Sequence, residues 1–400
     1  MSTGLEDFPE TTARLDGEVD EQLFTKGAQV SIRVAGEEVY AYVGGDDGRG
    51  QPVAHDSVFR VYCTTKPIAA LAVATLVDDG VLDLDEPLAD RLPEVRALTG
   101  TVTLRHVLSH AAGLHRPSAV EVELVPPDRR PAFFAAGERP ARFAVGSEVA
   151  YSERFAWHVV GLVLEQATGE ELGALLRRRV LDPLGLGDTW IGMSDEEYDA
   201  VLPRLGLNHD MRQLRSFPLL LERGRRWCTE VNAAHGGYTT AHDLAQLYAA
   251  LLAQLAGADD PALPSADTLR TFTSPVRPPS LDHILDRVCS HGLGFMTDLA
   301  GHAFGPMVSS SSFGHSGNVG SSFAFADPEH DLAVAVVFNG IVDPESAFLR
   351  RPVVVRAVYR DLGLLDPPAP VAAPPAEGRG RRFRFGRARQ EPEPGREAWQ

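Results

Sequence analysis

Residues 56–80, DSVFRVYCTTKPIAALAVATLVDDG, contain the stretch that decides the fold. From Thr65 to Asp79 the residues are apolar on nearly every side of a helix, which predicts a helix that is buried all round. Pro67 falls in the first turn, where its missing N–H is tolerated, and Gly80 follows the last turn, where glycine commonly ends a helix. We therefore expect a buried helix with Cys63 and Lys66 at its N-terminal end.

The pair Cys63 and Lys66 is the first candidate for chemistry. A spacing of three residues places both side chains on one helix face, and a thiol at a helix N-terminus beside an ammonium group favours the thiolate. A cysteine alone is more often a small buried hydrophobe. However, Lys26 and Lys66 are the only lysines among 38 basic residues. Lysine can exchange a proton and arginine cannot, so a retained lysine indicates proton chemistry.

The flanking segments predict how the chain is organised. Amphipathic or apolar helices are expected at 8–25, 155–167, 241–255 and 346–362, and strands at 29–35, 38–44, 322–326 and 332–338. Strands occur at both chain ends and are scarce in the middle. The expected fold class is therefore α/β (α+β), with an antiparallel sheet built from both chain ends, flanked by helices, and an inserted, mostly helical lobe.

We expect one catalytic domain over 1–365. Its α/β lobe would comprise about 1–75 and 230–365, and its helical lobe about 76–229. Residues 366–376 (DPPAPVAAPPA) read as a proline-rich linker and 377–400 as a disordered, arginine-rich tail.

Composition limits which partners the chain is expected to bind and in which compartment it is expected to lie. A net charge of −17 argues against nucleic acid or an anionic membrane, which leaves a small molecule as the expected partner. Three cysteines, an acidic N-terminus and the absence of a long apolar run predict a cytoplasmic chain without export. His106 and His110 are four residues apart but lack a third ligand, so no metal is expected there, and no cofactor is indicated. The oligomeric state is not indicated.

Several segments together resemble one known family. Residues 56–80, followed by 82–93 (LDLDEPLADRLP) and 104–114 (LRHVLSHAAGL), resemble the serine β-lactamase and penicillin-binding-protein superfamily. The similarity is greatest to the branch of class C β-lactamases and family VIII esterases. It continues through 143–169, 184–189, 236–251 and 313–340.

The resemblance implies roles for particular residues. The nucleophile position of the family's Ser-x-x-Lys falls on Cys63, with the lysine at Lys66, and the tyrosine of its Tyr-x-Asn falls on Tyr151. Glu153 stands where the family carries asparagine. Cys63 would attack a carbonyl while Lys66 and Tyr151 relay its proton, provided that burial and mutual proximity lower their pKa values.

The resemblance also implies a binding strand. The family's Lys/His-Thr/Ser-Gly triplet falls on His315, Ser316 and Gly317, which would bind substrate together with Glu153. The backbone amides of Cys63 and Asn318 would form the oxyanion hole.

Cysteine at the nucleophile position leaves three functions open. The chain could pass an acyl group from an ester, thioester or amide to an amine or hydroxyl acceptor, because a thioester is a good acyl donor to amines. It could instead be a cysteine-dependent esterase or amidase, or a non-catalytic binding protein. A cytoplasmic chain does not meet the cell wall, so a small acyl compound of specialised metabolism is the expected substrate.

Overall fold

A computed structural model describes residues 8–365, except 23, 96, 99, 117–120, 122–124, 127, 128, 141 and 214. Residues 1–365 form one compact unit. The predicted linker and tail lie outside the described residues, and the division of 1–365 into two lobes stays a prediction. No helix among the described residues combines the length and apolar character needed to cross a bilayer.

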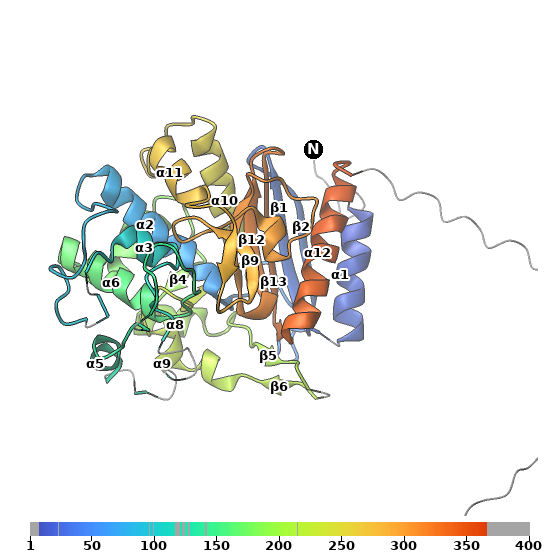
Figure 1. Ribbon diagram of the computed structural model, residues 1–400. Helices are drawn as coiled ribbons and strands as arrows, with labels where there is room; N and C mark the ends of the chain where they lie inside the picture. Colours follow the sequence, from blue (N-terminus) through green and yellow to red (C-terminus); the bar gives the residue numbers. More distant parts are fainter. Residues whose placement is uncertain are drawn as a thin grey trace, which may run out of the picture. The chain divides into compact units, whose positions relative to one another are not determined.

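The centre of the fold is an eight-stranded sheet with the order β2-β1-β13-β12-β11-β10-β9-β8 (Figure 1). Every neighbouring pair is antiparallel. The N-terminal β1 pairs with the C-terminal β13, which confirms the predicted sheet built from both chain ends. Its strands are β1 (Gly27–Val34), β2 (Glu37–Gly45), β8 (Ser280–Asp282), β9 (Arg287–His291), β10 (Met296–Thr297), β11 (Phe313–Gly317), β12 (Ser322–Asp327) and β13 (Leu332–Phe338).

Two terminal helices, α1 (Pro9–Glu21) and α12 (Pro344–Asp361), lie side by side along the sheet (Figure 1). They are joined by hydrogen bonds from the backbone N–H groups of Glu10 and Thr11 to the carboxylate of Asp361. A hydrophobic core that includes Leu15, Phe325 and Val358 fills the space between these helices and the sheet.

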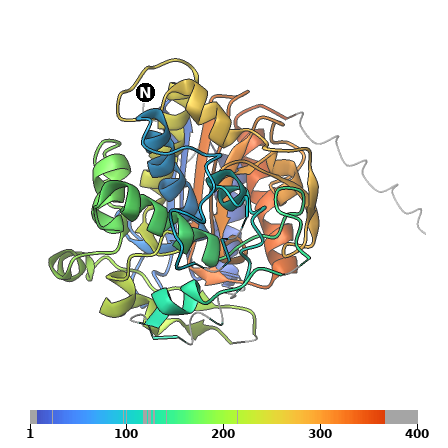
Figure 2. The same ribbon diagram turned by 60° about the vertical axis from the view of Figure 1, so that its left-hand side comes forward.

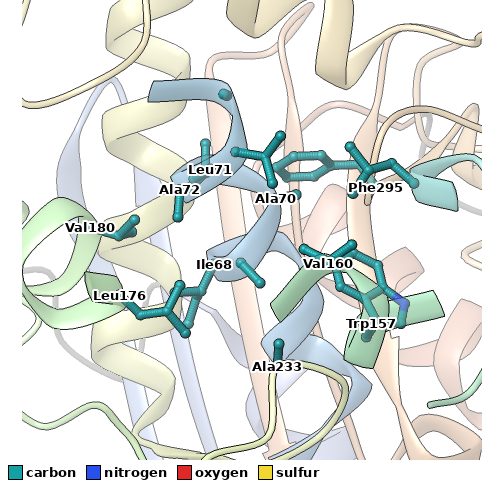
Figure 3. Close-up of a cluster of buried hydrophobic side chains, with 14 of the residues drawn as sticks. Ile68, Ala70, Leu71, Ala72, Trp157, Val160, Leu176, Val180, Ala233 and Phe295 are labelled. Carbon is teal, nitrogen blue, oxygen red and sulfur yellow. The ribbon is translucent and has the colours of Figure 1, made fainter. Parts of the chain in front are cut away.

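A larger hydrophobic core lies beyond the other face, where α10 (Ala241–Leu255) packs on β1, β12 and β13. Helix α2 (Lys66–Asp78) contacts α6 (Phe155–Thr168), α7 (Leu172–Leu176) and β11, and it lies among the other elements in the turned view of Figure 2. Every residue of α2 from Lys66 to Ala74 is buried. Figure 3 shows apolar side chains of this helix among Trp157, Leu176 and Phe295. The predicted buried helix is confirmed.

The remaining elements are short. The other helical segments are η2 (Cys63–Thr65), α3 (Leu104–Leu108), α5 (Arg130–Ala135), η4 (Arg177–Leu181), α8 (Asp195–Val201), η5 (Leu220–Arg223), α9 (Arg225–Cys228), α11 (Ala266–Thr273), η6 (Leu299–His302) and η7 (Asn318–Gly320). Two small sheets have the orders β3-β7-β4 and β14-β5-β6. Their strands are β3 (Phe59–Tyr62), β4 (Trp190–Ile191), β5 (His209–Asp210), β6 (Phe217–Pro218), β7 (Gly237–Thr239) and β14 (Gly340–Ile341).

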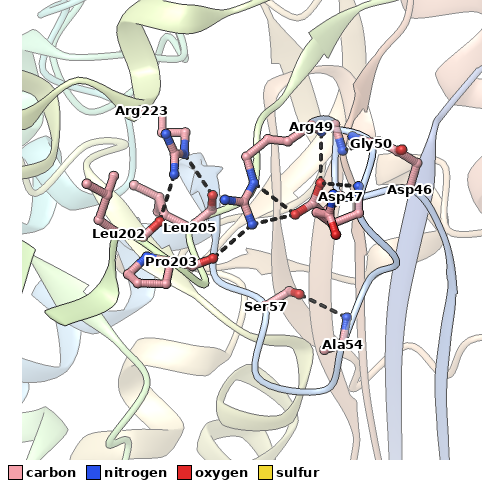
Figure 4. Close-up of polar contacts among 12 residues, drawn as sticks. Asp46, Asp47, Arg49, Gly50, Ala54, Ser57, Leu202, Pro203, Leu205 and Arg223 are labelled. Carbon is pink, nitrogen blue, oxygen red and sulfur yellow. Dashed lines mark hydrogen bonds and ion pairs between the residues drawn. The ribbon is translucent and has the colours of Figure 1, made fainter. Parts of the chain in front are cut away.

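The loop between β2 and β3 is fixed to the segment that follows α8. Arg49 pairs with Asp47 and donates a hydrogen bond to the backbone oxygen of Pro203 at 2.9 Å (Figure 4). Arg223 donates to the backbone oxygens of Leu202 and Leu205 in the same segment. These contacts hold the chain in place just before β3, which leads into Cys63.

The structure departs from the sequence analysis in two helix boundaries and in three strands. The first helix ends at Glu21 rather than near residue 25, and the last one begins at Pro344, two residues before the predicted start. Strands β8, β9 and β10 were not predicted, because they are short and carry polar residues such as Ser280, Asp282 and His291.

Candidate active site

A strained turn places Cys63 at the start of the central helix. Tyr62, the last residue of β3, has φ 51° and ψ −131°, a conformation that a non-glycine residue adopts only when its surroundings hold it there. The Thr65 hydroxyl donates to the Tyr62 backbone oxygen at 2.6 Å, and the Tyr62 hydroxyl donates to Glu222 at 2.6 Å. Cys63 is therefore fixed at the N-terminus of η2, where its thiol is half-buried.

Lys66 is fully buried, and its amine is held by two backbone oxygens. Its Nζ donates to the backbone oxygens of Ala234, at 2.9 Å, and Glu153, at 3.1 Å. Burial lowers the pKa of Lys66, while the charges of Cys63 and Glu153 oppose this shift. The lowered pKa favours the neutral amine, the form in which a lysine can accept a proton.

Tyr151 approaches the same thiol from the segment before α6. Its ring centroid is 5.3 Å from Lys66 Nζ, and the charge of Cys63 acts on its hydroxyl. Burial raises the pKa of Tyr151 well above its usual value, and the negative charges of Cys63 and Glu153 act in the same direction. The expectation that this pKa is lowered was wrong. Tyr151 is a neutral phenol that can pass a proton on but does not act as a phenolate base.

Two distant groups hold the Tyr151 segment in place. The backbone N–H of Tyr151 donates to Asp282 Oδ1 at 3.0 Å, and that of Ser152 donates to His110 Nδ1 at 3.1 Å. The His110 ring also packs on the Tyr151 ring, with 4.5 Å between centroids. The Nδ1 of His106 is likewise engaged, by the backbone N–H of Thr103 at 3.2 Å. Both histidines that were considered as metal ligands therefore accept hydrogen bonds from backbone N–H groups.

The third part of the site is β11, which lies against η2. A Cβ on Gly317 would lie 2.1 Å from the backbone oxygen of Val61 and 2.3 Å from Ser322 Oγ, so only glycine permits this approach. The Ser322 hydroxyl donates to the same Val61 oxygen at 2.6 Å. Asn318 follows Gly317 directly. Its backbone N–H therefore lies at the end of β11, the strand that contacts the turn carrying Cys63.

His315 is buried and uncharged in this setting. Its Nδ1–H donates to the backbone oxygen of Ser316 at 2.9 Å, which leaves Nε2 with its lone pair. Burial lowers its pKa well below the usual value, and the charge of Lys66 acts in the same direction. Its ring centroid is 6.3 Å from that of Tyr151. Ser316 is half-buried and Glu153 is exposed, so both can meet a ligand from solvent.

The structure adds residues that the sequence analysis missed. Arg154 lowers the pKa of Lys66 through its charge, and the Trp157 ring centroid is 5.6 Å from Nζ. Ala234 contributes only a backbone oxygen, so no side chain marks it in the sequence. Arg154 and Trp157 also line a cavity of about 220 Å³, together with Phe134, Leu172 and Ala233. This cavity adjoins the two residues whose carbonyls bind Lys66.

Comparisons with known proteins agree with this geometry. A model of the Beta-lactamase family matches residues 15–359. The chain is 33% identical over 218 residues to the esterase EstB of Burkholderia gladioli, covering 49% of this chain and 55% of EstB. It is 31% identical over 105 residues to the acyltransferase calJ of Penicillium decumbens, covering 22% and 25% of the two chains. The chain thus spans about half the length of the first relative and a quarter of the second.

A solved structure extends the comparison to nearly the whole fold. The crystal structure of a family VIII carboxylesterase superposes with a TM-score of 0.73 at 26% identity, covering 90% of this chain and 99% of that one. The predicted fold class and family are confirmed.

Proposed function

Because the chain belongs to the β-lactamase family, we propose that it is an acyl-transfer enzyme in which Cys63 forms a covalent acyl-enzyme. One observation carries the proposal: the buried Lys66 amine, held by the backbone oxygens of Ala234 and Glu153, lies 5.3 Å from the Tyr151 ring, and the charge of Cys63 acts on the pKa of both groups. The esterase and acyltransferase activities named for the two relatives support this class of chemistry.

The first step transfers a proton from Cys63 to the neutral amine of Lys66. The Cys63 sulfur then forms a bond to the carbonyl carbon of an ester, thioester or amide. The backbone amides of Cys63 and Asn318 stabilise the negative charge on the carbonyl oxygen. The bond to the leaving group breaks, and the leaving group takes a proton from Lys66 through the Tyr151 hydroxyl. The acyl group remains on sulfur as a thioester.

The second step releases the acyl group to an acceptor. An amine nitrogen attacks the thioester carbonyl and loses a proton, the C–S bond breaks, and Cys63 recovers a proton. Glu153 is exposed, and its charge acts on both Lys66 and Tyr151, so its carboxylate lies near the reacting group. It would hold a cationic acceptor amine there. His315 and Ser316 would bind the substrate from the strand.

Intact-protein mass spectrometry tests the acyl-enzyme. Incubation with a panel of activated esters and thioesters should add one acyl mass, which peptide mapping should locate on Cys63. Cys63→Ala should abolish the adduct, whereas Cys228→Ala removes a fully buried thiol and should leave the adduct unchanged. An unmodified wild-type chain across the panel would refute catalysis and favour the binding protein.

The hydrolase remains the second candidate, since the Glu153 carboxylate could instead activate water. If Glu153 holds an amine, adding amines should divert the product from acid to amide, and Glu153→Gln should weaken amine use more than hydrolysis. Glu138→Gln, a change at another exposed glutamate, is the control. A product that stays acid with every amine, and that Glu153→Gln abolishes, would establish a cysteine hydrolase.

A further inference from the structure

A second group of reactive side chains lies outside the active site. Cys289 and His291 are on β9 and His302 ends η6. All three are buried, with exposed fractions of 3 to 5%. One ligand atom from each, a cysteine sulfur and two imidazole nitrogens, lies within 4.8 Å of the others. These are the ligand types that a transition metal selects.

The spacing of the sulfur and nitrogen atoms matches a tetrahedral metal site. Cys289 Sγ is 3.6 Å from His291 Nε2. Around a tetrahedral Zn²⁺, Zn–S and Zn–N bonds of about 2.3 and 2.0–2.1 Å separate the sulfur and nitrogen by about 3.5 Å. The two atoms thus stand at the separation that a shared metal requires.

The orientation of His302 is a separate observation that points to a metal. Its Nε2–H donates to the backbone oxygen of Ser290 at 2.6 Å, which leaves the lone pair on Nδ1. Metal-bound histidines usually donate their other ring N–H to a carbonyl or a carboxylate in this way, because the bond fixes the tautomer and the ring.

Asp282 brings a second negative charge beside this cluster. Its side chain is fully buried, and Oδ2 is 3.1 Å from His291 Nε2. A thiolate from Cys289 and the carboxylate of Asp282 together balance the charge of a divalent cation. Oxygen-seeking ions such as Mg²⁺ and Ca²⁺ do not select a cysteine and two histidines, whereas Zn²⁺ is commonly bound by these ligand types.

We propose that Cys289, His291 and His302 bind one Zn²⁺ ion, with the buried carboxylate of Asp282 beside them. Binding releases the proton of the Cys289 thiol to solvent, and the Nε2 proton of His291 moves to Nδ1 so that the Nε2 lone pair can bind the ion. The site is structural, because its ligands are buried. It ties β9 to η6, next to the carboxylate of Asp282 that accepts the backbone N–H of Tyr151.

Zinc content of the full-length protein tests the site. After incubation with ZnCl₂ and desalting, elemental mass spectrometry should find one zinc per chain. Cys289→Ser should weaken zinc affinity, measured against a competing chelator, by on the order of 100-fold or more. Cys228→Ser, at a buried cysteine on α9, should retain wild-type affinity. Cys63→Ala should retain it too, which separates this site from the active site.

Cobalt provides a second readout. Co²⁺ bound to the wild type should give the visible bands of a tetrahedral ion and a thiolate charge-transfer band that Cys289→Ser removes. His302→Gln serves as a second ligand variant, with circular dichroism confirming that each variant is folded. A folded wild type that retains no zinc would overturn the proposal. So would folded Cys289→Ser and His302→Gln variants with wild-type affinity, or zinc that only Cys63→Ala removes.

Discussion

The carboxylate of Asp282 accepts the backbone N–H of Tyr151 at 3.0 Å, although 131 residues separate the two in the chain. The same oxygen accepts the backbone N–H groups of Ile284 and Leu285. Asp282 ends β8, the edge strand of the main sheet. The position of a candidate catalytic tyrosine therefore depends in part on a buried carboxylate at the edge of the sheet.

Asp282→Ala should strongly destabilise the protein. The change leaves buried N–H groups and His291 without their acceptor, a loss of about 3–5 kcal/mol in the free energy of unfolding. Asp85→Ala is the control, since Asp85 makes only an exposed pair with Arg105, worth about 0–1 kcal/mol. Urea denaturation in metal-free buffer measures both. Equal midpoints for the two variants would show that Asp282 does not make this contribution to the free energy of unfolding.

Cys63 should be the thiol that iodoacetamide modifies first. It is half-buried, whereas Cys228 and Cys289 are buried. Burial also raises the pKa of Cys228 to about 11 and that of Cys289 to about 12, so these two thiols stay protonated at neutral pH in the metal-free protein. Peptide mapping after brief labelling at pH 7 provides the measurement. Preferential modification of Cys228 or Cys289 would contradict the proposed reactivity of Cys63.

Lys66→Arg should lower the rate of Cys63 acylation by roughly 10²–10⁴-fold, the usual contribution of a general base. Arginine stays protonated at every accessible pH, so it cannot accept the proton of Cys63. Lys26→Arg changes the other lysine of the chain and should leave the rate unaltered. Both variants are compared by circular dichroism and by acylation kinetics. A near-normal rate in folded Lys66→Arg would assign Lys66 a purely electrostatic role.

The sequence alone predicts the parts of this molecule that depend on local pattern. The apolar run after Lys66 predicts α2, and the spacing of Cys63 and Lys66 predicts their common face, because both follow from helix geometry. The paired apolar runs that form β12 and β13 are equally local. The family resemblance is needed for Tyr151 and His315, since no spacing connects them to Cys63.

Other features depend on long-range contacts that no local pattern records. Ala234 and Glu153 hold Lys66 through backbone oxygens, which every residue possesses. Asp282 reaches Tyr151 from a strand too short to be predicted. The pKa of Tyr151 depends on how deeply it is buried and on the charges around it, and that is why its direction was predicted wrongly.

Glu153→Gln should shift the rising limb of the acylation pH profile to lower pH. The Glu153 charge raises the pKa of Lys66, so its removal lets the neutral amine form at a lower pH. Tyr151, with its pKa raised, stays protonated and adds no falling limb below pH 10. Single-turnover acylation rates measure the profile, with Glu138→Gln as the control. Because Glu153 is exposed, the shift should shrink at 1 M salt. A shift to higher pH would contradict this electrostatic account.

Gly317→Ala should disable catalysis with little effect on the remote fold. The new Cβ would lie 2.1 Å from the Val61 backbone oxygen, so β11 must move away from the turn that carries Cys63. The N–H of Asn318 moves with it, and loss of one oxyanion donor lowers the acylation rate by about 10²–10³-fold. Gly187→Ala is the matched control, since a Cβ there meets nothing within 4 Å. Acylation kinetics and the thermal midpoint are measured together. Wild-type acylation by folded Gly317→Ala would show that this close approach does not set the position of the oxyanion donor.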